Sequence, residues 1–235
     1  MSLVDSLRVL GAMARVSVPS LVDLVRGDLP RDSIDDRTHW FGRRVVEVLD
    51  VRLTATGADR VPPGAAVIYM SNHQSHLDIP ILYATLPSRT IRMLAKTELF
   101  KIPLWGRGLR AAEFVEVDRK NHARAVASIE QAATLLESGV SIWLAPEGTR
   151  SRDGRIGPLK KGGFHLAIET GVPIVPVAIR GTIDILPRGT RVMNPGKTVD
   201  VTIGAPISIE GRTVADLSAE VRDFLVGHVE QDQVS

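Results

Sequence analysis

The chain has 235 residues, a formal net charge of +2, 44% apolar residues and 24% charged residues, which suits one globular domain with or without a small appendage. This balance excludes intrinsically disordered and collagen-like chains. The absence of cysteine excludes disulfides, thiolate nucleophiles and cysteine-ligated metal centres. Aromatic residues make up 4% of the chain, too few for a surface that stacks single-stranded nucleic acid, so we expect no nucleic-acid partner.

The N-terminal segment, residues 1–50, predicts two helices. Its first part carries an apolar stripe at helical spacing: Leu3, Leu7, Leu10 and Ala14. Trp40 and Phe41 belong to the second helical stretch. We interpret 1–50 as an amphipathic helical segment that either packs on the rest of the protein or lies in a membrane interface. The segment does not resemble a signal peptide, and no apolar run of 18 residues occurs, so we expect no membrane-spanning helix.

After residue 50, apolar runs typical of strands alternate with helical patterns. The expected strands cover residues 51–56, 65–70, 90–95, 113–117, 140–145, 173–179 and 198–203. The expected helices cover residues 75–86, 103–109, 123–137, 163–170 and 214–228. Strands separated by helices favour an α/β fold with a largely parallel central sheet flanked by helices. Since we find no internal repeat or flexible linker, we assign residues 51–235 to one α/β domain.

The segment S-N-H-Q-S-H-L-D at 71–78 follows an apolar strand and opens a helix, a position where open α/β sheets bind ligands. His73 lies just before the expected helix and Asp78 in its first turn, so the Asp78 carboxylate can reach the His73 ring. A carboxylate bonded to Nδ1–H leaves Nε2 available as a general base. Alternatively, Ser75 and Asp78 form an S-x-x-D capping box and serve only the helix start. We interpret His76 as a packing residue.

A serine nucleophile is not indicated, because the sequence lacks the G-x-S-x-G motif that places one on a sharp strand-to-helix turn. A His–Asp pair without its own nucleophile suits a reaction in which the acceptor substrate supplies the attacking hydroxyl. The donor must then be activated already, as a thioester is.

A second polar segment, P-E-G-T-R-S at 146–151, follows the strand expected at 140–145. Gly148 lets the backbone approach a ligand closely, and the guanidinium of Arg150 can hold a phosphate or a carboxylate with two hydrogen bonds. Taken alone, the segment is equally compatible with an ordinary polar turn. Lys96 and Arg119 also follow expected strands and could reach the same sheet edge, although each alone reads as surface charge.

Basic residues gather in the middle of the chain. Between residues 89 and 124 nine basic residues face four acidic ones: Arg89, Arg92, Lys96, Lys101, Arg107, Arg110, Arg119, Lys120 and Arg124. Such a cluster next to a candidate site favours an anionic ligand or an anionic membrane surface as partner.

Together, these segments resemble the glycerolipid acyltransferase family, the group that contains the 1-acylglycerol-3-phosphate acyltransferases. Four blocks match in family order: His73 to Asp78 as H-x4-D, Phe114 to Arg119 preceded by residues 96–99, P-E-G-T-R-S at 146–151, and V-P-I-V-P-V at 172–177. The match runs from about residue 65 to 177. The chain has Ala145 and Glu116 where the family often has a phenylalanine and a hydrophobic residue. These departures concern acceptor and chain-length preference rather than reaction class.

The resemblance implies a role for each matched residue. His73 is the base that takes the proton from the acceptor hydroxyl, and Asp78 orients it. The acceptor phosphate is held by residues of the third block with two cations nearby: Glu147, Gly148, Thr149 and Arg150, with Lys96 and Arg119. The donor is acyl-CoA or acyl carrier protein, and no metal or other cofactor is implied. Bacterial members work at the cytoplasmic face of the cell membrane, as peripheral or monotopic proteins.

The expected reaction is acyl transfer to the free hydroxyl of 1-acylglycerol 3-phosphate (lysophosphatidic acid), which gives phosphatidic acid in phospholipid biosynthesis. Glycerol 3-phosphate is the alternative acceptor, because the same motifs serve both. A thioesterase or lipid hydrolase that uses Ser75 and a non-catalytic lipid-binding protein are the alternatives from other functional classes.

Overall fold

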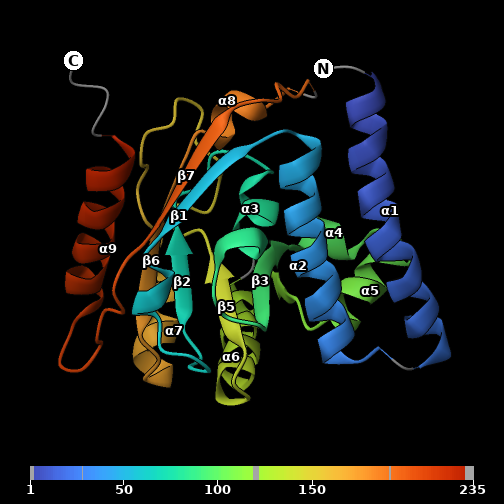
Figure 1. Ribbon diagram of the computed structural model, residues 1–235. Coiled ribbons are helices and arrows are strands. Elements are labelled where there is room, and N and C mark those ends of the chain that lie inside the picture. The colour runs from blue at the N-terminus through green and yellow to red at the C-terminus, as the bar shows by residue number, and fades with distance from the viewer. Residues whose placement is uncertain (1–2, 28, 119–121, 191, 231–235) are drawn as a thin grey trace.

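The computed structural model describes residues 3–27, 29–118, 122–190 and 192–230 (Figure 1). In these ranges a single sheet of seven strands has the order β1-β7-β6-β2-β5-β3-β4. Its strands are β1 (Arg52–Thr56), β2 (Ile68–Ser71), β3 (Ile91–Lys96), β4 (Val115–Val117), β5 (Ser141–Leu144), β6 (Ile174–Arg180) and β7 (Thr198–Ile203). All neighbouring strands run parallel except β6 and β7, which are antiparallel. The predicted α/β fold with a largely parallel sheet is confirmed.

Helices cover both faces of the sheet. They are α1 (Leu3–Arg26), α2 (Arg31–Val48), α3 (Asp78–Thr85), α4 (Thr97–Phe100), α5 (Trp105–Ala111), α6 (His122–Glu137), α7 (Gly162–Thr170), α8 (Thr182–Ile185) and α9 (Val214–Val229), with a 3-10 turn at Ala58–Arg60. Residues of α3 and the end of α2 form one apolar core with the sheet, and residues of α6, α7 and α9 form a second core. The sheet therefore lies between two helical layers, as a parallel sheet requires.

Strand β6 shows how the sequence produces this layering. Val175, Val177 and Ile179 belong to the core under α3, whereas Ile174 and Ala178 belong to the core under α7 and α9. Side chains alternate between the two faces of a strand, so both sets must be apolar when both faces are covered. The continuous apolar run expected at 173–179 is therefore a central strand.

The helix expected at 75–86 begins three residues later than expected, at Asp78. The backbone N–H groups of Gln74 and Ser75 donate to the Asp78 carboxylate at 2.8 and 3.0 Å. The segment before Asp78 therefore folds around this carboxylate instead of forming a helical turn. The four-residue helices α4 and α8 were also not expected, because a single turn has no apolar period to detect.

The two N-terminal helices differ in how they attach to the body. Val45 of α2 and Leu49 just after it are fully buried in the core. The Asp35 carboxylate of α2 forms a buried ion pair with Arg92 of β3 at 2.6 Å. Arg92 is therefore not part of a surface basic cluster, which corrects our expectation for this residue. The division of the chain at residue 50 remains a prediction, although α2 shares the core of the sheet.

Helix α1 carries apolar side chains that are exposed. Its exposed large apolar residues are Leu7, Met13, Val18, Val22 and Val25. Within the described ranges, no helix combines the length and apolar character that crossing a bilayer requires.

Candidate active site

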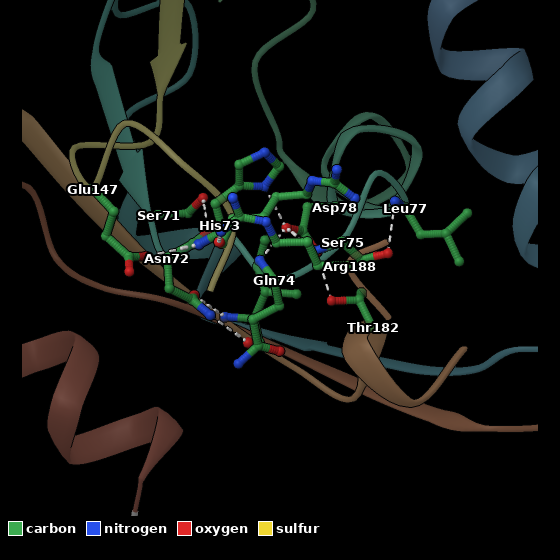
Figure 2. Close-up of polar contacts among 12 residues, drawn as sticks. Ser71, Asn72, His73, Gln74, Ser75, Leu77, Asp78, Glu147, Thr182 and Arg188 are labelled. Atoms are coloured by element: carbon green, nitrogen blue, oxygen red, sulfur yellow. Dashed lines mark hydrogen bonds and ion pairs between the residues drawn. The ribbon is translucent and has the colours of Figure 1, made fainter. Parts of the chain in front are cut away.

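The candidate site lies at the carboxyl end of β2, near the middle of the sheet (Figure 2). His73 follows this strand by two residues, and Asp78 is the first residue of α3. Because β2 has parallel neighbours on both sides, the loops after β5 and β6 lie at the same edge. Segments distant in the sequence thus meet around His73.

The central contact of the site joins the His73 ring to the Asp78 carboxylate. His73 Nδ1 lies 2.7 Å from Asp78 Oδ2, so a proton on Nδ1 leaves Nε2 as the basic nitrogen. Asp78 is fully buried, and its other oxygen, Oδ1, accepts a hydrogen bond from Thr182 Oγ1 at 2.5 Å. Four donors thus hold the carboxylate: His73 Nδ1, Thr182 Oγ1 and the N–H groups of Gln74 and Ser75.

These contacts reconcile the two interpretations of Asp78. The backbone N–H of Ser75 donates to Asp78, as in a capping box. The oxygen that receives this hydrogen bond, Oδ2, also faces His73 Nδ1. One carboxylate therefore both organises the start of α3 and orients the imidazole.

The backbone of His73 is held by the segment after β5. Its N–H donates to Glu147 Oε1 at 3.0 Å, and its carbonyl oxygen accepts from the Ser151 N–H at 2.7 Å. The other Glu147 oxygen accepts from the Gly157 N–H at 2.9 Å. Burial raises the pKa of Glu147, and the two N–H donors partly offset that effect. Glu147 thus joins its own loop to the backbone of His73.

Neighbouring side chains fix the end of β2. The Asn72 amide donates to the carbonyl oxygen of Ile179 and accepts from the Ile179 N–H, both at 2.8 Å. Trp143 presents its ring nearly perpendicular to that of His73, with centroids 5.9 Å apart, and its Nε1–H donates to Ser71 Oγ at 2.9 Å. His73 is consequently presented from a rigid strand end, with 18% of its side chain exposed.

Ser75 is not arranged as a nucleophile. Its side chain is fully buried. Its Oγ donates to the carbonyl oxygen of Leu186 at 2.9 Å and accepts from the Leu77 N–H at 3.2 Å. These contacts use the hydroxyl to hold the loop together, so the geometry does not favour the hydrolase alternative that we considered for Ser75.

Comparison with known proteins shows the family of the chain. A model of the Acyltransferase family matches residues 52–180, more than half of the chain. The chain belongs to the Acyltransferase family. This confirms the family resemblance read from the four sequence blocks, all of which lie within the matched range.

Individual relatives of this chain carry names that agree with this family. The chloroplast 1-acyl-sn-glycerol-3-phosphate acyltransferase BAT2 of Brassica napus is 40% identical over 141 residues, which make up 60% of this chain and 40% of that protein. The 1-acyl-sn-glycerol-3-phosphate acyltransferase alpha of Mus musculus is 34% identical over 170 residues, 72% of this chain and 59% of that protein. This chain thus spans less than two thirds of either curated relative.

A solved structure is similar to this protein over almost the whole chain. The crystal structure of the 1-acyl-sn-glycerophosphate (LPA) acyltransferase PlsC from Thermotoga maritima is similar with a TM-score of 0.83 and 28% sequence identity. The similarity covers 99% of this chain and 96% of that chain. It therefore includes the N-terminal helices as well as the sheet.

The structure places the residues predicted to hold phosphate in different surroundings. Arg150 is half-buried, Thr149 is exposed, and Gly148 has a φ of +72° that favours glycine. Lys96 is exposed at the end of β3. Arg119 lies outside the described residues. As ligands of an acceptor phosphate, these residues remain predictions.

The structure bears on the predictions for two neighbouring residues. His76 is exposed rather than packed, since the loop turns it away from the core. Glu147 directs both oxygens at backbone N–H groups, and a carboxylate repels a phosphate, so its contacts suit a positioning residue better than a phosphate ligand.

The sequence analysis assigned no role to Asn72, Trp143, Thr182 or Arg188. Asn72 lies within the segment 71–78 and Trp143 in the strand before P-E-G-T-R-S, but their contacts join β2 to β6 and β5. Thr182 and Arg188 lie beyond the matched range, and neither has a local pattern that would mark it. Their position after β6, a strand that ends at the same edge, was the available signal.

Proposed function

We propose that this protein transfers a fatty acyl group from a thioester donor, acyl-CoA or acyl carrier protein, to the free hydroxyl of 1-acylglycerol 3-phosphate. The product is phosphatidic acid. The observation that carries the proposal is the 2.7 Å contact of His73 Nδ1 with the buried Asp78 carboxylate, in a site whose neighbouring serine is already engaged. The names of the relatives and the near full-length likeness to PlsC support the choice of acceptor.

The reaction follows from this arrangement. His73 Nε2 takes the proton from the acceptor hydroxyl while the hydroxyl oxygen attacks the thioester carbonyl carbon. The resulting tetrahedral intermediate breaks its C–S bond, and the imidazolium returns the proton to the leaving thiolate. Asp78 stabilises the imidazolium between these two steps, as an orienting carboxylate does in other acyl-transfer sites. Proton transfer and acyl exchange consume no electrons, so the proposal includes no cofactor besides the acyl donor.

The acceptor phosphate binds on the side of the site where Arg150 and Lys96 lie. Arg150 offers two parallel N–H donors to phosphate oxygens, and Lys96 adds a second charge. Glu147 contributes indirectly under this proposal, by holding the backbone of His73.

We also propose that the protein works as a peripheral or monotopic protein on an anionic membrane surface, because its lipid acceptor and product reside in a bilayer. Helix α1 supports this location, since Leu7 and Val18 are each 57% exposed and Val25 is 78% exposed. An amphipathic helix with such a face binds at the level of the lipid headgroups. The cytoplasmic face is the side proposed, because a CoA thioester is too polar to cross a bilayer.

An acceptor panel with one labelled acyl-CoA tests the proposal. The panel contains 1-acylglycerol 3-phosphate, glycerol 3-phosphate, lysophosphatidylcholine and no acceptor, and the product is scored by class and by the position acylated. We expect phosphatidic acid from the first acceptor and no fatty acid release without an acceptor. Preferential acylation of glycerol 3-phosphate would identify the alternative acceptor, and fatty acid release from the donor alone would contradict acyl transfer.

A further inference from the structure

Arg188 brings an additional positive charge to the site from a segment that the sequence motifs do not include. It lies between α8 and β7, and its side chain is exposed. Its Nη1 donates to the backbone carbonyl oxygen of Arg150 at 2.6 Å. Figure 2 draws Arg188 together with His73, Asp78 and the other residues of the site. The segment after β6 is thus attached to the segment after β5 by an arginine.

The two guanidinium groups repel each other. Burial lowers the pKa of Arg150, and the charge of Arg188 lowers it further. Within the described residues, neither arginine forms an ion pair with a carboxylate, unlike Arg31 with Glu113 or Arg92 with Asp35. The Asp78 carboxylate acts on Arg150 in the opposite sense, as the smallest of the three effects, and its oxygens already bond His73 and Thr182. The two neighbouring cations therefore favour a bound anion.

One more cationic side chain, Lys96, belongs to the same group. The charges of Arg150 and Lys96 both lower the pKa of the neighbouring His76, after the larger effect of its partial burial, so His76 itself adds no full charge at neutral pH. Lys96 is the last residue of β3, whereas Arg150 and Arg188 follow β5 and β6. We call Lys96, Arg150 and Arg188 the cationic cluster. Since the charges come from three separate segments, the cluster is a product of the fold and not of one basic stretch.

We propose that Arg188 is a specificity-determining residue: with Arg150 it grips the terminal phosphate of the acceptor and selects a phosphate monoester over a diester. This rests on the proposed function and names the headgroup class that the site takes. A monoester carries close to two negative charges at neutral pH and three terminal oxygens. When Arg150 binds two of these oxygens, the third remains for Arg188. A diester carries one charge and two such oxygens, so the second arginine gains much less from it.

Kinetics of Arg188 variants test this assignment. In Arg188→Gln we expect the KM for 1-acylglycerol 3-phosphate to rise by about 10- to 150-fold, the range for loss of a charged hydrogen bond. The donor KM and kcat should stay within a few-fold, because Arg188 is not placed at the reacting atoms. Arg188→Lys keeps the charge but not the fork, so its acceptor KM should lie in between. Arg212→Gln is the matched control. Arg212 lies before α9, outside the cationic cluster, and forms an ion pair with Glu220.

Direct binding separates failure of this inference from failure of the proposed function. The probes are hexyl phosphate and hexyl methyl phosphate, which share a chain and differ by one charge, and titration calorimetry measures each without turnover. The parent and Arg212→Gln should prefer the monoester, and Arg188→Gln should lose that preference. Equal binding of the two probes by the parent, or an unchanged preference in a folded Arg188→Gln, would overturn the inference. A preference that depends on Arg188 in a protein that acylates nothing would leave the phosphate site standing and reject the acyltransferase activity.

Discussion

Glu147 accepts hydrogen bonds from two backbone N–H groups, those of His73 and Gly157. The resemblance to other acyltransferases implies that it touches the acceptor phosphate, whereas its contacts imply that it positions His73, the proposed general base. The two roles differ in what a substitution should change. A phosphate ligand affects acceptor binding, and a positioning residue affects the rate of the bound complex.

We expect Glu147→Gln to lower kcat by about 10- to 100-fold with little change in the acceptor KM. A glutamine can accept the His73 N–H but presents an NH2 group to the Gly157 N–H, so the loop must shift. A displacement of about 1 Å at a reacting group can cost 100-fold in rate. Glu230→Gln is the control, because Glu230 Oε1 accepts the Ile156 N–H, which a glutamine can also do. A large rise in acceptor KM with kcat unchanged would restore Glu147 as a phosphate ligand.

The part of the site that could be predicted from the sequence is the part that depends on local spacing. His73 and Asp78 are five residues apart at a strand-to-helix junction, so their contact follows from short-range geometry. Thr182 reaches the same carboxylate from 104 residues away, and a single sequence carries no local signal for such a pair. Asn72 was visible in the motif, but its hydrogen bonds to β6 depend on strand order.

At the level of elements, the contact between α2 and α3 supports the site from behind. Gly42 of α2 lies so close to α3 that an added Cβ would be 2.6 Å from the Pro80 carbonyl oxygen and 2.8 Å from the Ala84 nitrogen. These are backbone atoms and cannot turn aside. Since α3 begins with Asp78, a displacement of α3 would reach the carboxylate that orients His73.

Gly42→Ala should therefore destabilise the protein by about 1–3 kcal/mol, the usual cost of forcing an extra group into a packed contact, and should also lower kcat. Gly11→Ala on α1 is the matched control, because nothing lies within 4 Å of its added Cβ. There we expect no loss, or a gain of about 0.5–1 kcal/mol from replacing a helical glycine. Urea denaturation followed by circular dichroism measures both. Equal stability of the two variants would contradict the described packing of α2 on α3.

The sequence predicted the longer elements well, because their apolar periods report which faces are buried. The strand expected at 198–203 matches β7, and the helix expected at 214–228 ends one residue before α9 does. It could not predict α4 and α8, which are one turn long and are held by their surroundings. Nor could it place the start of α3, which depends on the side-chain contacts of Asp78.

At the scale of the whole molecule, ion pairs neutralise part of the positive charge of the mid-chain basic residues. Arg89 lies 3.1 Å from Asp36, and Arg110 lies 2.7 Å from Glu116. These pairs join distant or separate elements, so a count of charges along the chain overestimates the attraction to an anionic surface. The exposed apolar residues of α1 therefore carry more of the proposed membrane contact than we expected from the sequence.

We expect a triple substitution of Val18, Val22 and Val25 by serine to lower binding to anionic vesicles by at least roughly 10-fold, since full burial of one such side chain is worth about 1.5–3 kcal/mol. Activity toward a short-chain, water-soluble acceptor should persist. Ile168→Ser on α7 is the control, because Ile168 is also exposed but lies on another helix. Vesicle sedimentation measures the binding. Unchanged sedimentation of the triple variant would assign the attachment to another surface.

In the proposed function, His73 is the general base of acyl transfer to the acceptor hydroxyl. The most direct test is the steady-state rate of phosphatidic acid formation by His73→Ala, with labelled acyl-CoA and 1-acylglycerol 3-phosphate. Removal of a general base costs about 10²–10⁴-fold in rate, so we expect kcat to fall by at least that factor while hexyl phosphate still binds. A correctly folded His73→Ala protein that forms phosphatidic acid at the parental rate would contradict the account.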